Sequence, residues 1–159
     1  MLKYLNTQVT FSEVPDEITL CINITGCKIG CKNCHSSYLA EDIGEELNTD
    51  SLHELISNNK GITCVCLMGG DSNPEYINIL GRTIKCHKLK SAWYSGRQEL
   101  SKDIEMKNFN AIKLGPYIEE LGPLNSKTTN QTFYEVIQVA DEGGKMDYKL
   151  NDITYKFWK

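Results

Sequence analysis

An alternation of short apolar runs with amphipathic segments, between residues 18 and 94, constrains the fold of this chain more than any other feature. Residues 62–68 form a continuous apolar run, which is typical of a parallel strand covered on both faces. Similar strands are expected at residues 18–24 and 91–94. Helices are expected between them, one after the capping segment 48–51 and one starting at Pro74. This order predicts βαβ units, a mostly parallel sheet and therefore an α/β fold.

The length of the chain limits how far such a sheet can close. The chain has 159 residues, which favours a single domain over residues 1–159. A complete eight-fold barrel typically needs about 250 residues, so we expect an open, partial (β/α) barrel. In open α/β sheets, ligands bind at the carboxyl ends of the strands. Further extended segments are expected at residues 8–11, 111–114, 133–139 and 148–158.

Charge and hydropathy exclude several classes of function. The net charge is −4, the sequence pI is near 5.4, and Lys and Arg are scattered, so no nucleic-acid partner is expected. The chain contains no stretch of about 18 uncharged apolar residues, so no membrane span is expected. The N-terminal residues lack the apolar core of a secretory signal, which predicts a cytoplasmic protein.

Three of the seven cysteines lie within eight residues, directly after the expected strand 18–24. Cys27, Cys31 and Cys34 have the spacing C-x3-C-x2-C, and the odd total argues against a disulfide framework. Thiolates are the usual ligands of iron–sulfur clusters, and three on one loop can hold three irons of a cubane and leave the fourth open. Gly26 and Gly30 allow the loop to fold tightly around a bulky inorganic core.

Other interpretations of the cysteines remain open. A structural zinc site needs a fourth ligand, and His35 is the nearest candidate, although adjacent residues rarely point at the same ion. Buried packing cysteines are a second alternative, against which the lysines of the loop argue. Outside the loop, Cys86, next to His87, is a metal candidate, although a position at a helix end is the preferred interpretation for it. His53 is expected to be a surface or packing residue rather than a ligand. Packing within apolar strands is expected for Cys21, Cys64 and Cys66.

The cysteine spacing after a first strand resembles the motif of the radical S-adenosylmethionine (SAM) superfamily. The resemblance implies a 4Fe–4S cluster held by Cys27, Cys31 and Cys34, whose open iron binds the amino and carboxylate groups of SAM. It also implies a partial radical SAM barrel. Many members have an aromatic residue before the third cysteine, near the adenine. In this chain Asn33 stands there and His35 follows the cysteine, and the resemblance implies that residues 33–35 belong to the cofactor-binding site.

The turn Gly69-Gly70-Asp71 resembles the glycine-rich turn of that superfamily, which follows the second core strand and holds the methionine amino group. The usual acid there is Glu, and Asp71 is one methylene shorter. The resemblance also suggests that Ser95 contacts the ribose or carboxylate of SAM and that Lys113 contacts its carboxylate. Alternatively, Lys113 is a strand-edge charge that blocks aggregation.

A closer resemblance, over nearly the whole chain, is to the activating proteins of anaerobic ribonucleoside-triphosphate reductase, which commonly lack that aromatic residue too. The segments that carry it, in chain order, are residues 24–35, 93–96, 113–118, 129–131 and 152–158. Taken alone, the later segments can equally be core residues, turns and solvated loops. The roles of Asn130, Gln131 and the C-terminal segment are left open.

This resemblance implies a reaction and two protein partners. A flavodoxin-type donor reduces the cluster, SAM is cleaved reductively, and a hydrogen atom is abstracted from a backbone glycine of the large reductase subunit. An open barrel leaves a side on which a macromolecule can insert a loop. The alternatives are another small radical SAM enzyme, acting on a different glycyl-radical enzyme or a small molecule, a non-catalytic zinc- or cluster-binding module, and a purely structural α/β protein.

Overall fold

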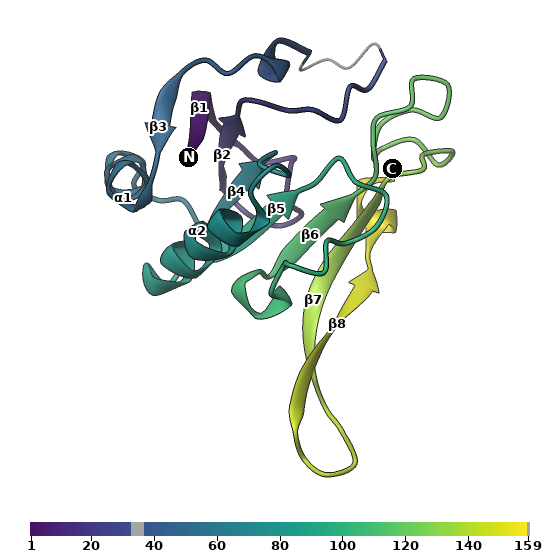
Figure 1. The fold of residues 1–159 in the computed structure, drawn as a ribbon. Helices are drawn as coiled ribbons and strands as arrows, with labels where there is room; N and C mark the ends of the chain where they lie inside the picture. The colour runs from purple at the N-terminus through teal and green to yellow at the C-terminus, as the bar shows by residue number, and fades with distance from the viewer. Residues whose placement is uncertain (33–36, 159) are drawn as a thin grey trace.

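The computed structural model describes residues 1–32 and 37–158 and shows one α/β domain built on an eight-stranded sheet (Figure 1). Short 3-10 turns occupy Ser37–Ala40, Met106–Asn108 and Thr154–Phe157. The strands and helices are β1 (Leu2–Thr10), β2 (Thr19–Ile24), β3 (Glu45–Leu47), α1 (Thr49–Asn58), β4 (Cys64–Met68), α2 (Pro74–Cys86), β5 (Lys90–Tyr94), β6 (Ala111–Leu114), β7 (Thr132–Ala140) and β8 (Met146–Asp152).

The sheet has the strand order β3-β1-β2-β4-β5-β6-β7-β8. The central strands β2, β4, β5 and β6 are parallel, which confirms the expected βαβ order, whereas β1, β3, β7 and β8 pair antiparallel. The expected parallel pairing of strands is therefore confirmed for the centre of the sheet only. The β1–β2 and β7–β8 pairs are hairpins, because antiparallel neighbours need only short connections, whereas β1–β3 and β6–β7 pair across longer segments of the chain. The β7–β8 hairpin projects away from the rest of the molecule (Figure 1).

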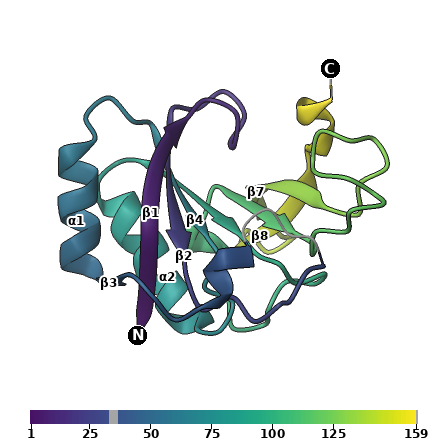
Figure 2. The same ribbon diagram turned by 90° about the horizontal axis from the view of Figure 1, so that it is seen from above.

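Local capping signals account for both helices. Asn48 and Ser51 form a capping box at α1, in which each side chain accepts a hydrogen bond from the other residue's backbone N–H. In α2, Pro74 occupies the first turn and Asn73 Oδ1 accepts from the backbone of Tyr76. The two helices lie next to each other (Figures 1 and 2). No helix in the described part of the chain is long and apolar enough to cross a bilayer.

The alternation of side chains along the strands creates two apolar clusters. The first, on the helix-covered face, includes Leu20, Leu67 and Trp93, which are fully buried with residues of α1 and α2. The second covers the opposite face and includes Cys21, Cys64, Cys66, Ala92, Tyr94 and Phe133, packed with loop residues instead of helices. The cysteines expected to pack within strands are thus confirmed as core residues.

Burial makes the core thiols hard to ionise. It is the main cause that raises the pKa of Cys64 to about 12, and it also raises the pKa values of Cys66 and Tyr94 well above their usual range. The pKa of Cys21 is lowered, chiefly by its hydrogen bond with Cys66. The raised pKa values dominate, so the folded state keeps protons at alkaline pH that the unfolded chain releases.

We therefore expect the free energy of unfolding to fall as pH rises from about 9 toward 12, because the unfolded state then binds fewer protons than the folded state. Urea unfolding at pH 7.5, 9.5 and 10.5 measures this slope. Cys64→Val should flatten it, whereas Cys86→Val, at an exposed thiol, should leave it unchanged. Equal slopes for Cys64→Val and the wild type would contradict the assignment.

Candidate functional site

The loops that carry the sequence motifs leave one edge of the sheet. Asn23, Met68, Tyr94 and Lys113 pair across neighbouring strands at the ends of β2, β4, β5 and β6. The cysteine loop, the glycine turn and the segment after Tyr94 therefore begin side by side at the carboxyl edge. This is the edge where ligands of open α/β sheets bind.

The cysteine loop is anchored at its start by backbone hydrogen bonds to the segment that follows it. Gly26 donates to Glu41 O at 3.0 Å, and Cys27 donates to Leu39 O at 2.9 Å. Thr25 Oγ1 donates to Ile43 O at 2.7 Å, which closes the base of the loop. These contacts bring residues 37–43 back beside the end of β2, as Figure 1 shows.

The described thiols of the loop fit an iron–sulfur cluster in donor type and in surroundings. Cys27 and Cys31 are free, half-buried thiols. Gly26 and Gly30 have φ values of +75° and +71°, a region that L side chains disfavour. A Cβ built on either glycine meets no atom within 4 Å, so the loop borders open space that a bulky inorganic core can fill.

Asn33, Cys34 and His35, all predicted to belong to the site, lie outside the described residues. Among residues 1–32 and 37–158, no group of three His, Cys, Asp or Glu side chains is placed to hold a metal ion. Two cysteines of the triad, Cys27 and Cys31, are among the described residues, and the third, Cys34, is not.

The glycine turn after β4 is held in a close-packed conformation. Gly69 and Gly70 have φ values of +107° and +84°, and a Cβ on Gly70 would lie 2.5 Å from Ile77 Cδ1. Gly69 donates its N–H to Tyr94 O at 3.0 Å, while its carbonyl accepts from the indole Nε1 of Trp93 at 2.8 Å. A buried side chain of β5 therefore fixes the orientation of the turn.

Asp71 joins the loops that follow β4 and β5. Its Oδ1 accepts from Ser95 Oγ at 2.5 Å, and its Oδ2 accepts from the backbone N–H of Gly96 at 3.0 Å. Arg97 Nε lies 3.8 Å from Oδ1, and the Asp71 side chain is 11% exposed. A carboxylate has about four acceptor sites, so capacity remains for a further donor such as an ammonium group.

Removing the Asp71 carboxylate should loosen this edge. We expect Asp71→Ala to lower the free energy of unfolding by about 2 kcal/mol, because hydrogen bonds to a charged group contribute roughly 1.5–3 kcal/mol. Urea unfolding measures the change. Asp42→Ala removes a mostly exposed carboxylate 3.3 Å from Lys3 Nζ and should cost less than about 1 kcal/mol. Equal losses for the two variants would contradict a linking role for Asp71.

Ser95 is buried against the carboxylate of Asp71. Ser95 is 1% exposed, its hydroxyl donates to Asp71, and its oxygen accepts from the Arg97 N–H at 3.1 Å. The resemblance suggests that Ser95 contacts SAM, and this stays a prediction; in the structure the hydroxyl of Ser95 supports Asp71.

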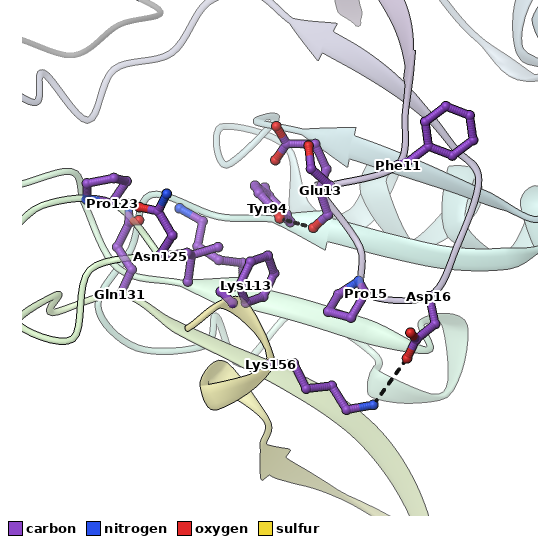
Figure 3. Close-up of a pocket in the computed structure, with 13 residues that line it drawn as sticks. Phe11, Glu13, Pro15, Asp16, Tyr94, Lys113, Pro123, Asn125, Gln131 and Lys156 are labelled. Carbon is purple, nitrogen blue, oxygen red and sulfur yellow. Dashed lines mark hydrogen bonds and ion pairs between the residues drawn. The ribbon is translucent and has the colours of Figure 1, made fainter. Parts of the chain in front are cut away.

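Lys113 lies beside Tyr94 on the sheet face that carries no helix. It is 8% exposed, its Nζ donates to Gly115 O at 3.1 Å, and it lies 5.4 Å from the centre of the Tyr94 ring. Both side chains line a cavity of about 940 Å³. Figure 3 shows Lys113 between Tyr94 and the amide side chains of Asn125 and Gln131.

The loop between β1 and β2 forms one wall of this cavity. Glu13 accepts a hydrogen bond from Tyr94 Oη through its backbone carbonyl, and Asp16 lies 3.5 Å from Lys156 Nζ (Figure 3). Exposed Phe11 lies at the start of the same wall. The cavity thus adjoins the carboxyl edge from the side opposite the helices.

Asn130 and Gln131 support the segment after β6. Asn130 Nδ2 donates to Pro116 O at 2.9 Å, and Gln131 Nε2 donates to Gly115 O at 3.4 Å. These bonds hold the turn that receives Lys113. Among the described residues, Asn130 Oδ1 is buried without a hydrogen-bond partner.

Two contacts of this region are not predicted by the sequence reasoning, that of Trp93 with Gly69 and that of Ile29 with Gly96. The hydrogen bond from Trp93 to Gly69 joins residues that are 24 positions apart in the chain, so no local motif indicates it. Ile29 of the cysteine loop packs against Gly96, where a Cβ would lie 2.8 Å from Ile29 Cγ1. Gly96 itself is the one sequence signal for its contact with Ile29.

Comparison of the chain with profiles of known protein families, with curated proteins and with solved structures finds no significant match.

Proposed function

We propose that this protein is a radical SAM activating enzyme of anaerobic (class III) ribonucleoside-triphosphate reductase. The observation that carries the proposal is the meeting of the cysteine loop and the Gly69-Gly70-Asp71 turn at the carboxyl ends of adjacent parallel strands. When bound, a reduced 4Fe–4S cluster would supply the one electron that cleaves SAM, and the radical released from SAM would take a hydrogen atom from a backbone glycine of the reductase.

The cysteine loop provides the ligands in this proposal. Cys27, Cys31 and Cys34 are the residues that would hold three irons of the cluster through their thiolates. The anchoring bonds from Gly26 and Cys27 to the 39–41 segment keep the loop over the end of β2. The contact of Ile29 with Gly96 sets the loop against the segment that follows β5.

The neighbouring turns orient the cofactor in this proposal. Asp71 would accept a hydrogen bond from the amino group of the methionine moiety. Ser95 Oγ and the Gly96 N–H donate to the Asp71 carboxylate and keep it in place. Lys113 provides a buried positive charge for a carboxylate. The protein contributes binding, orientation and exclusion of water, and the hard chemistry belongs to the cofactors.

The open side of the sheet suits a macromolecular substrate. The helix-free face holds the 940 Å³ cavity, which is bordered by loops rather than by further helices. We propose that the reductase chain completes this side and that a flavodoxin-type protein donates the electron. The described cysteines are free thiols, as is usual in a reducing cytoplasm, where we place the protein.

The test uses the complete, anaerobically reconstituted protein with SAM, a reductant and the large reductase subunit. We expect a glycyl-radical signal in the electron paramagnetic resonance spectrum of the reductase. No signal is expected when Cys31→Ala replaces the wild type, and the Cys86→Ala control should retain it. Cleavage of SAM without any glycyl radical on the reductase would redirect the proposal to another substrate.

A further inference from the structure

The outer helical face carries two imidazoles that the proposed site does not use. His53 lies on α1, and His87 is the C-cap residue of α2. His53 Nδ1 lies 2.5 Å from His87 Nε2, the ring centres are 4.6 Å apart, and the ring planes are inclined by 55°. The two rings therefore meet through ring nitrogens rather than by stacking.

The fold holds this pair in place and keeps it apart from the carboxyl edge. Leu52 and Ile56 of α1 and Ile84 of α2 are buried in the same cluster, so the backbones on both sides are fixed. The His87 N–H donates to Ile84 O at 3.0 Å. His87 precedes β5, so the pair lies toward the amino ends of the strands, opposite the proposed cluster.

We propose that His53 and His87 form a two-imidazole binding site for a first-row divalent transition metal ion. A neutral imidazole has one N–H and one nitrogen lone pair, so in the present contact one nitrogen donates and the other accepts. When the donor ring carries its proton on its other ring nitrogen instead, both rings stay neutral and both nitrogens of the contact present lone pairs to the same point. Imidazole nitrogen is a preferred ligand of zinc, copper and nickel.

The geometry requires only a small adjustment. Metal–nitrogen bonds are about 2.0–2.1 Å, which places two ligand nitrogens about 3.4 Å apart in tetrahedral geometry and about 2.9 Å apart at the 90° angles typical of Ni²⁺. The nitrogens must therefore separate by about 0.4–0.9 Å, starting from the 2.5 Å contact. His53 is exposed and His87 is half-buried, so their side chains can rotate without disturbing the core.

The remaining ligands are expected to be water. Within the described residues, no third His, Cys, Asp or Glu joins the pair, and Cys86 is not part of it although it adjoins His87. A site with two protein ligands binds reversibly, and a bound ion links α1 to α2. The ion should therefore stabilise the folded state.

The experiment titrates Ni²⁺ into the full chain, without reconstituted cluster, under anaerobic conditions at pH 7.5 in a calorimeter. Ni²⁺ is the probe because it binds imidazole well. His53→Ala and His87→Ala should each weaken one binding step by more than about 100-fold, since even outer partners of metal ligands contribute 10- to 100-fold. Cys86→Ala is the matched control and should leave that step unchanged.

Thermal unfolding provides the second measurement. Ni²⁺ should raise the midpoint of the wild type and of Cys86→Ala, and the part of the rise that depends on the pair should be absent in both histidine variants. Identical titrations and midpoints for the wild type and the histidine variants would overturn the proposal and leave the pair as a hydrogen bond. Loss of the step in Cys86→Ala would also overturn it. These outcomes are independent of SAM cleavage, so they do not depend on the proposed function.

Discussion

Cys31→Ala is expected to abolish both iron binding and SAM cleavage. Three thiolates on one loop are needed to hold a cubane that leaves one iron open, and two thiolates cannot do so. We expect the affinity for the cluster to fall by more than about 100-fold, since loss of even the outer partners of metal ligands costs 10- to 100-fold in affinity, so that little iron is retained after desalting. Iron and sulfide analysis, the visible absorption spectrum and the yield of 5′-deoxyadenosine measure the result.

Cys86→Ala is the matched control for this prediction. Cys86 is an exposed free thiol at the end of α2, distant in the fold from the cysteine loop. This variant should bind iron and cleave SAM like the wild type. A Cys31→Ala protein with wild-type iron content would show that the triad does not hold the cluster.

Trp93→Ala is expected to cause the largest loss of stability. Trp93 is fully buried in the helix-side cluster, and its ring centre lies 6.1 Å from that of Phe109. Truncation of a buried tryptophan typically costs about 3–5 kcal/mol of the free energy of unfolding. Urea unfolding measures this loss, and a change below about 1 kcal/mol would contradict the packing described.

Trp93→Phe separates the hydrogen bond from the packing. It keeps most of the apolar volume but removes the donor to the Gly69 carbonyl, so we expect a smaller loss of stability and a weaker affinity for SAM. Trp158→Phe is the matched control, because Trp158 also donates to a backbone carbonyl, that of Leu124 at 3.2 Å, but is 36% exposed. Equal SAM affinities for the two variants would show that Trp93 does not orient the turn.

Local signals in the sequence predict much of the fold. The caps at Asn48 and Pro74 locate both helices, and the apolar run before Gly69 locates the central strand. These features depend on hydrogen bonds and side-chain periodicity within a few residues. The order of motifs along the carboxyl edge follows, because parallel strands end at the same edge.

Features set by contacts between distant segments are not predicted. Strand β3 (Glu45–Leu47) is short, lacks apolar alternation and exists through its pairing with β1. The end of the chain at Thr154–Phe157 is a 3-10 turn rather than part of an extended run, because Asp152 Oδ1 accepts from both the N–H and the hydroxyl of Thr154. The side-chain periodicity of a strand cannot reveal either feature.

The candidate site likewise combines features that local sequence predicts with features set by contacts between distant segments. The spacing of the cysteines and the Gly69-Gly70 pair are visible in the sequence, since both express local backbone needs. The hydrogen bonds that Ser95 and Gly96 donate to Asp71 join residues that are 24 and 25 positions apart in the chain. The cavity wall that contains Glu13 depends on a hydrogen bond from Tyr94, which is 81 positions away. Only the folded sheet brings these groups together.

The most direct test of the central proposal is anaerobic reconstitution of the wild-type chain with iron and sulfide, followed by addition of dithionite and SAM. The reductase subunit is included in a parallel reaction. We predict a brown protein that produces 5′-deoxyadenosine and methionine in equal amounts, with or without the subunit. A colourless protein that retains zinc at the cysteine loop and produces no 5′-deoxyadenosine in either reaction would contradict the proposal.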